Sequence, residues 1–230
     1  MFNNAIESKL FADDLKLYSE ADNLIIQHGF DDLVSSCNKW QLPLKKCFSK
    51  RVGRPNIIPD PKYSLGNCLL PNLTSAKDLG VTIYNKLHFN AHIFINIGRA
   101  HARVYLIHKC FISRNTQSLV RGFVTYVRLI LEYASSTWSP STITNNKKVE
   151  SVQKRITKCL KGLHEVDYQN RLLALGLDSL ELRRLRADPT LTYKILFGLI
   201  DVDPTQFFNI YNGPPRRGHI LSITLQHKTA

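Results

Sequence analysis

Apolar residues spaced three and four apart dominate the second half of the chain, and this spacing constrains the fold more than any other feature. One face of an α-helix repeats with this period. The sequence therefore predicts three amphipathic helices, starting near Asn90, after Asn115 and near Asn145. Their apolar faces comprise Ile93, Ile97, Ala100, Val104, Ile107 and Phe111 in the first, Leu119, Phe123, Tyr126, Ile130 and Tyr133 in the second, and Val149, Val152, Ile156, Leu160 and Leu163 in the third.

The positive charge of the chain is concentrated in the same region. The 230 residues include 31 Lys and Arg against 18 Asp and Glu, which gives a net charge of +13. Residues 1–89 contain 11 basic and 9 acidic side chains, residues 90–200 contain 17 and 7, and residues 201–230 contain 3 and 2. The excesses are therefore +2, +10 and +1. A basic region of this kind indicates a polyanionic partner, either nucleic acid or an anionic membrane surface.

The second and third predicted helices have outer faces that are almost purely basic. Charge on a helix face usually only meets solvent, but unopposed like charges destabilise a helix unless something neutralises them. Nucleic-acid phosphates would do so, with an affinity that falls steeply with salt. The predicted nucleic-acid-binding residues are Arg99, Arg103, Arg114, Arg121, Arg128, Lys154, Arg155, Lys158 and Lys161, and Lys147 shares the face of the third helix.

Two adjacent carboxylates lie near the N-terminus. The segment Lys9–Tyr18 places Asp13 and Asp14 between two short apolar runs. This pattern predicts a strand, a tight turn and a second strand. Two acids side by side repel each other unless a divalent cation lies between them, and Mg²⁺ held by carboxylates and substrate phosphates is the usual occupant. Such a site would serve phosphoryl or nucleotidyl transfer. The alternative is a solvated turn, because Asp is a common turn residue.

The segments between the acidic pair and the helices contain further elements. Ser19–Trp40 has the apolar spacing of one amphipathic helix, and Tyr63–Pro71 and Ala76–Ile83 predict two or three short strands. His88 and His92 lie four apart, a spacing that two metal ligands on a helix can have. No third ligand is nearby in the sequence, so we expect these histidines to pack or to cap.

The cysteines and the apolar runs indicate where the protein resides. The chain has five cysteines, an odd number with no Cys-x-x-Cys pair, which argues against a disulfide framework and against a zinc ribbon. We expect reduced, mostly buried thiols in an intracellular protein, in the cytoplasm and nucleus. The sequence has neither a signal peptide nor an apolar run of about 18 residues, so we expect no membrane partner.

Several stretches resemble one protein family. Phe11-Ala12-Asp13-Asp14, followed by Leu15-Lys16-Leu17-Tyr18, resembles the third polymerase motif of reverse transcriptases, in the version of LINE-type, jockey-like non-LTR retrotransposons. Lys77–Ile83 resembles the hairpin that joins palm to thumb in these enzymes. The thumb and post-thumb helices of jockey-like elements are similar to Ala100–Arg103, Cys110–Arg114, Thr125–Arg128, Ile130–Tyr133, Trp138–Pro140, Glu150–Arg155 and Arg171–Asp188. The resemblance covers nearly all of residues 9–208.

This resemblance implies an α+β fold in three parts. Residues 1–89 would form a partial palm of β-hairpins plus a helix, residues 90–200 an all-helical basic thumb, and residues 201–230 a loose C-terminal tail. The implied activity is RNA-directed DNA synthesis on an RNA template and a DNA primer. Asp13 and Asp14 would be its catalytic acids and would bind Mg²⁺ in a two-metal site.

The family's bridging acid and its glycine-rich nucleotide pocket lie upstream of the third motif, and residues 1–8 contain no counterpart of either. We therefore expect this chain to be inactive alone and to need the upstream part of the polymerase, if that part is expressed. Two alternatives stay open. The chain could be a non-catalytic fragment that binds nucleic acid through the thumb, or an inert relic of a truncated element.

The last long helix shows a start signal and a break signal. Asp178 and Glu181 have the spacing of a capping box, which predicts a helix start. Pro189 removes a backbone donor, so we expect a kink or a break there, at a cost of ~3 kcal/mol in a continuous helix.

Overall fold

A computed structural model describes residues 6–11, 14–19, 23–39, 46–53, 62–210 and 223–224. The fold is α+β, with long helices and small antiparallel two-stranded sheets. The chain divides into two compact units, residues 1–92 and residues 93–230.

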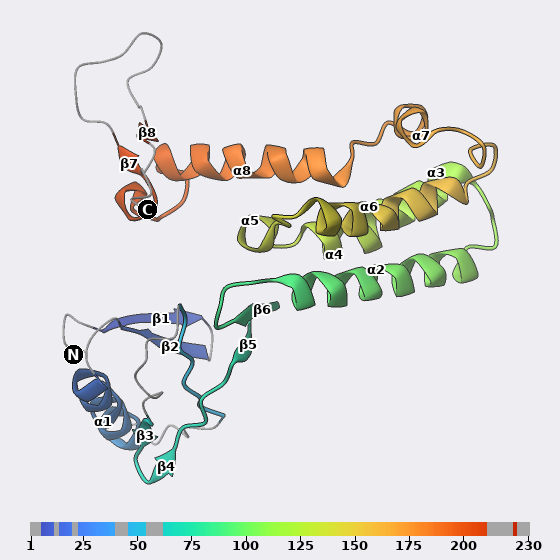
Figure 1. Ribbon diagram of the computed structural model, residues 1–230. Helices are drawn as coiled ribbons and strands as arrows, with labels where there is room; N and C mark the ends of the chain where they lie inside the picture. Colours follow the sequence, from blue (N-terminus) through green and yellow to red (C-terminus); the bar gives the residue numbers. More distant parts are fainter. Residues whose placement is uncertain are drawn as a thin grey trace. The chain divides into compact units, whose positions relative to one another are not determined.

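The first unit contains the predicted hairpin (Figure 1). Strands β1 (Glu7–Phe11) and β2 (Asp14–Tyr18) pair antiparallel, with Phe11 opposite Asp14. This pairing confirms the two predicted strands, while the predicted turn lies outside the described residues. Residues 12 and 13 connect the two strands and lie outside the described residues, so the predicted site residue Asp13 has no described position.

Helix α1 (Asn23–Lys39) and two further hairpins complete this unit. The hairpins are β3 (Ser64–Leu65) with β4 (Cys68–Leu69), and β5 (Ser75–Asp78) with β6 (Val81–Tyr84). The sequence predicted two or three short strands in these segments, and the structure has four. The Gln27 side chain attaches α1 to β3, because its amide exchanges two hydrogen bonds of 2.9 and 3.0 Å with the Ser64 backbone. The β5–β6 turn needs positive φ at both central residues, and Gly80 adopts a φ of 87° there.

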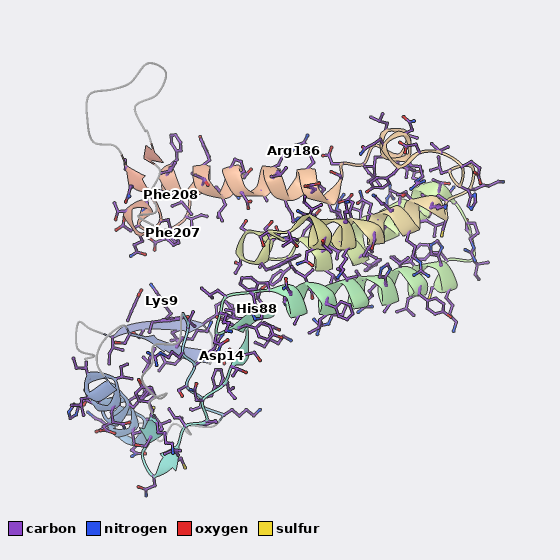
Figure 2. The ribbon with its side chains drawn as sticks, viewed as in Figure 1. Lys9, Asp14, His88, Arg186, Phe207 and Phe208 are labelled. Carbon is purple, nitrogen blue, oxygen red and sulfur yellow. The ribbon has the colours of Figure 1, made fainter. Side chains whose placement is uncertain are left out.

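The predicted packing roles of His88 and His92 are confirmed. His92 is 3% exposed, and its Nδ1 accepts a hydrogen bond of 3.2 Å from the Thr82 backbone. The His88 ring stacks on Tyr84 with a centroid distance of 5.1 Å. His88 lies in the connection between β6 and α2 (Figure 2).

The second unit is mainly helical (Figure 1). Residues 90–200, all of which are described, contain helices and connections without a strand. The helices are α2 (Asn90–Cys110), α3 (Thr116–Phe123), the π-helical segment η1 (Val124–Arg128), α4 (Leu129–Glu132), α5 (Ser135–Trp138), α6 (Ile143–Lys158), α7 (Tyr168–Leu175) and α8 (Leu180–Leu196). Beyond them lie the 3₁₀ segment η2 (Pro204–Gln206) and the short pair β7 (Asn209–Ile210) and β8 (Ile223–Thr224).

The core of this unit follows the predicted apolar spacing in α2 and α6. Its side chains exposed by 5% or less include Ile93, Ala100, Val104, Ile107, Val149, Val152, Ile156 and Leu160. Trp138 is 1% exposed, and its indole nitrogen donates a hydrogen bond of 2.7 Å to the Tyr133 carbonyl. The buried Gly122 of α3 faces Ile107 of α2 and the Phe111 ring, and a Cβ there would make ordinary van der Waals contacts of 3.5–3.8 Å with them.

The predicted apolar face of the second helix is wrong after Phe123. Tyr126 and Tyr133 are 60% and 59% exposed, whereas Val127 and Leu131 are fully buried. The cause is η1, because a π-helical turn contains more residues than an α-helical turn and shifts the following side chains around the helix. The buried positions therefore step by four from Leu119 onward.

Helix α8 differs from its prediction in two ways. Its N-cap is Ser179, whose hydroxyl accepts a hydrogen bond of 3.1 Å from the Leu182 backbone, and Asp178 instead pairs with Arg186. The sequence predicted a kink or a break at Pro189, and the helix continues through it without a break. Pro189 is exposed to solvent, where water can reach the carbonyl that its missing N–H leaves unbonded.

The predicted burial of the cysteines is also wrong for most of them. Cys37 is buried in α1 and Cys47 is half-buried. Cys68, Cys110 and Cys159 are exposed.

Candidate nucleic-acid interface

Asp14, the described member of the acidic pair, is exposed at the start of β2 (Figure 2). The neighbouring Lys16 forms an ion pair with Asp78 of β5, and this hydrogen bond, aided slightly by the charge of Asp14, raises the pKa of Lys16. Among the described residues, no three His, Cys, Asp or Glu side chains form a metal-binding group. The described residues therefore do not by themselves make the donor set that a two-metal site requires, and Asp13 lies outside them.

The exposed face of α6 carries only basic charge. Five of its side chains are exposed cations, namely Lys147, Lys148, Lys154, Arg155 and Lys158, and we call them the α6 basic face. They fall within an arc of about 120° at 3.6 residues per turn. The one acid of α6, Glu150, is 9% exposed and lies outside this arc, where its carboxylate binds the start of α8. Within the described part of the chain, no carboxylate lies within ion-pairing distance of the five cations.

The C-terminal half of this face borders an open depression of about 680 Å³. Lys154, Arg155 and Lys158 form one wall, while His164, Tyr168 and Arg171 come from α7 and the connection before it. We call it the α6–α7 depression. The structure thus brings together three of the predicted nucleic-acid-binding residues.

Tyr168 is held rigidly in this depression. Its hydroxyl donates to the Glu150 carboxylate and accepts a hydrogen bond of 3.2 Å from the Gln153 amide. Burial and the bond to Glu150 raise the pKa of Tyr168 far above its ordinary value, so the phenol stays neutral. The Lys154 ammonium lies over the ring, 5.0 Å from its centroid, and the Arg171 guanidinium lies 5.4 Å from it.

Glu150 also explains why α7 and α8 sit where they do. Besides the Tyr168 hydroxyl, its carboxylate accepts hydrogen bonds of 3.2 and 3.3 Å from the backbone N–H groups of Leu180 and Glu181. A carboxylate at a helix N-terminus is favourable because the first N–H groups have no partner within the helix. The single acid of α6 is therefore used for folding, which leaves only basic charge on the exposed face of the helix.

Two carboxylates also border the depression, and both have other partners. Glu165 contacts the His164 Nδ1 at 2.5 Å, and Asp167 caps α7 by accepting a hydrogen bond of 3.0 Å from the Gln169 backbone. Arg171 is anchored by hydrogen bonds of 2.6 Å to the Val166 carbonyl and 3.3 Å to the Thr157 hydroxyl. The cations of the α6 wall are the charges that remain available to a ligand.

Arg155 also affects two histidines of α2. His101 and His108 lie seven residues apart, and His101 Nδ1 and His108 Nε2 are buried without a hydrogen-bond partner. Burial and the charge of Arg155 lower the pKa of His101. Burial, Arg114 and Arg155 lower the pKa of His108. Arg114 and Arg155, which come from separate segments, therefore both lower the pKa of His108.

The other predicted binding residues lie elsewhere. Arg99 and Arg103 are exposed on α2, Arg121 is exposed on α3, and Lys161 is exposed in the turn after α6. Arg128 does not join an exposed basic face. It is half-buried, and its Nε lies 3.7 Å from the Glu132 carboxylate, because η1 has rotated it toward α8.

Sequence reasoning missed Tyr168, Arg171 and His164 as members of the depression. The signal that was present is the N-cap Asp167, which predicts a helix start and therefore places Tyr168 and Arg171 three apart on one face. Nothing in the local sequence predicts that this face packs against α6.

Comparison with known proteins found no matching family model, no matching curated protein and no matching solved structure. None of the described helices combines the length and the apolar character needed to cross a membrane.

Proposed function

We propose that this chain is part of the RNA-directed DNA polymerase of a non-LTR retrotransposon, and that its helical unit binds the template–primer duplex. The observation that carries the proposal is the α6 basic face, five exposed cations with no carboxylate among them. Nucleic acid supplies the regular array of phosphates that such a face can neutralise.

The acidic hairpin supports the polymerase part of the proposal. An exposed acid at the start of β2, opposite Phe11 of β1, fits the third polymerase motif that the sequence resembles. The proposal gives Asp13 and Asp14 the role of metal-binding acids, with Mg²⁺ as the metal. The palm would then be the unit of residues 1–92, and the thumb would be the helical unit.

A second candidate is a non-catalytic nucleic-acid-binding protein. It is favoured by the ion pair between Lys16 and Asp78, because this pair engages the single carboxylate of β5 with an ammonium instead of a metal ion. This candidate needs only the helical unit.

Binding is tested by titrating an RNA–DNA hybrid duplex at several salt concentrations. We expect the triple variant Lys147→Gln/Lys154→Gln/Lys158→Gln to reduce the slope of log K against log salt by about 2.7, at roughly 0.9 per phosphate contact. The matched control removes three exposed lysines from the first unit, Lys39→Gln/Lys62→Gln/Lys86→Gln. Equal slopes for the two triple variants would contradict binding through α6.

Catalysis is tested by primer extension with Mg²⁺, an RNA template and a DNA primer. We expect no incorporation by this chain alone, because the resemblance supplies only two of the carboxylates that a two-metal site uses. Incorporation that is lost in both Asp13→Ala and Asp14→Ala would show instead that the chain holds a complete catalytic site. Duplex binding that is unchanged in these two variants, together with no incorporation in the presence of an added upstream segment, would favour the non-catalytic candidate.

A further inference from the structure

We propose that the α6–α7 depression holds consecutive phosphates of a single nucleic-acid strand and reads no base. This inference rests on the proposed function, because it assumes that the helical unit binds nucleic acid. The inference adds two points to the proposed function. It states where one strand lies, and it states that the protein recognises the sugar-phosphate backbone of this strand.

The charge around the depression fits phosphate. Lys154, Arg155 and Lys158 line one wall, and the carboxylates of the other wall are engaged with His164 and with the N-terminus of α7. An anion entering the depression therefore meets uncompensated cations on the α6 side. The depression is open to solvent. An open site suits a polymer that passes across it better than a small molecule, because small-molecule sites enclose most of the ligand surface.

The state of Tyr168 argues against base recognition. Proteins that bind single strands through their bases present free aromatic faces on which the bases stack. The Tyr168 ring instead has cationic groups of Lys154 and Arg171 over it, and its hydroxyl is bound to Glu150 and Gln153. Neither the ring face nor the polar tip is therefore offered to a base.

The spacing of the cations fits one strand that runs along α6. From Lys147 to Lys158 the helix rises about 16 Å, at 1.5 Å per residue. Each strand of a duplex carries one phosphate per roughly 3.4 Å of the duplex axis, and phosphates of an extended single strand lie further apart, so this length meets at most about five consecutive phosphates. The α6 basic face supplies five cations over the same distance.

The experiment compares a single-stranded 12-nucleotide DNA of mixed sequence with an oligonucleotide of the same length and charge that lacks its bases. The test variant is Lys154→Gln/Lys158→Gln. The control Lys109→Gln/Lys194→Gln removes the same charge from exposed positions on α2 and α8. Circular dichroism and thermal unfolding establish that each variant is folded.

We expect the test variant to reduce the salt slope by about 1.4, at roughly 0.7 per contact on a single strand, and to do so equally for both oligonucleotides. The control should leave the slope close to that of the unaltered protein. A loss that affects only the oligonucleotide with bases would overturn the inference, since stacking contributes about fivefold or more in affinity per base. An unchanged slope and affinity in the test variant would also overturn it.

Two further arms separate this inference from the proposed function and from another source of phosphate. If Lys147→Gln/Lys148→Gln reduces the slope and the test variant does not, the depression is not the binding site, although α6 still binds nucleic acid. If neither pair reduces it, both the inference and binding through α6 fail. We expect tripolyphosphate at equal phosphate concentration not to displace the DNA. If it does displace the DNA, the ligand of the depression is a compact polyphosphate and not a strand, and the inference is overturned.

Discussion

Arg183 binds Glu132 with two guanidinium nitrogens, and this pair connects α8 to α4. The Nη2 atom lies 3.0 Å from Oε2, and Nε contacts Oε1. The hydrogen bond to Glu132 raises the pKa of Arg183. Arg128 shares the same carboxylate at 3.7 Å, so one acid serves two arginines. Two-point pairs of this kind have fixed geometry and are stronger than a contact between point charges.

We expect Glu132→Gln to destabilise the helical unit by about 1–2 kcal/mol, because it leaves Arg128 and Arg183 facing each other and the site is only partly exposed. The melting temperature should fall by roughly 2–4 °C per kcal/mol in a unit of this size. Thermal unfolding followed by circular dichroism measures it. Asp201→Asn, at an exposed position, is the control, and an equal loss in both variants would remove the special role of Glu132.

The hydroxyl of Tyr168 provides a second prediction. We expect Tyr168→Phe to lower the free energy of unfolding by about 1–2 kcal/mol, because the Gln153 amide and the Glu150 carboxylate each lose a buried partner. Urea denaturation should show a lower midpoint with an unchanged m-value. Tyr105→Phe removes a hydroxyl from a side chain that is 65% exposed and should have little effect. A similar loss in the two variants would argue against the Tyr168 network.

The histidines of α2 predict a pH dependence. The pKa values of His101 and His108 are lowered in the folded protein from 6.5, mainly by burial and further by Arg155. The unfolded chain therefore binds more protons below about pH 6.5, and stability should fall as the pH drops from there through the folded pKa values. Above about pH 6.5, the free energy of unfolding should not change with pH because of His101 or His108.

Chemical denaturation between pH 8 and pH 5 tests this dependence. In the variant His101→Gln/His108→Gln, the free energy of unfolding should fall less steeply as the pH drops than in the unaltered chain. Each removed histidine should reduce this slope by at most the contribution of one bound proton. His164→Gln, at an exposed histidine, is the matched control. Parallel pH curves for the unaltered chain and the double variant would show that the two histidines do not titrate differently on unfolding.

Local spacing was enough to predict the parts of the fold that obey one period. Helix α2 and helix α6 each keep the α-helical repeat along their length, so Val104 and Ile156 are buried as expected. The exposed cations of α6 follow from the same repeat, because Lys154 and Lys158 lie one turn apart on the side opposite the core. The acidic hairpin was predictable because short apolar runs, Leu10-Phe11 and Leu15 with Leu17, stand on either side of the two acids.

The remaining features depend on contacts between segments that are distant in sequence. The α6–α7 depression exists because Glu150 of α6 holds both Tyr168 and the start of α8, and no spacing rule connects these positions. The start of α8 was misplaced by one residue for a related reason. Asp178 could have been the N-cap, but its carboxylate is used by Arg186, and Ser179 takes the capping role.

The register after η1 gives the last prediction. Val127 is fully buried, and its neighbour Tyr126 is 60% exposed, although the α-helical repeat from Phe123 would bury Tyr126. We expect Val127→Ala to cost about 1–3 kcal/mol in the free energy of unfolding, because it opens a cavity in the core. Tyr126→Ala should cost about 0.5 kcal/mol or less, as surface substitutions usually do. Denaturant unfolding of both variants would decide between the two registers. The reverse order would place Tyr126 in the core, and Arg128 would then return to the exposed basic side of the helix.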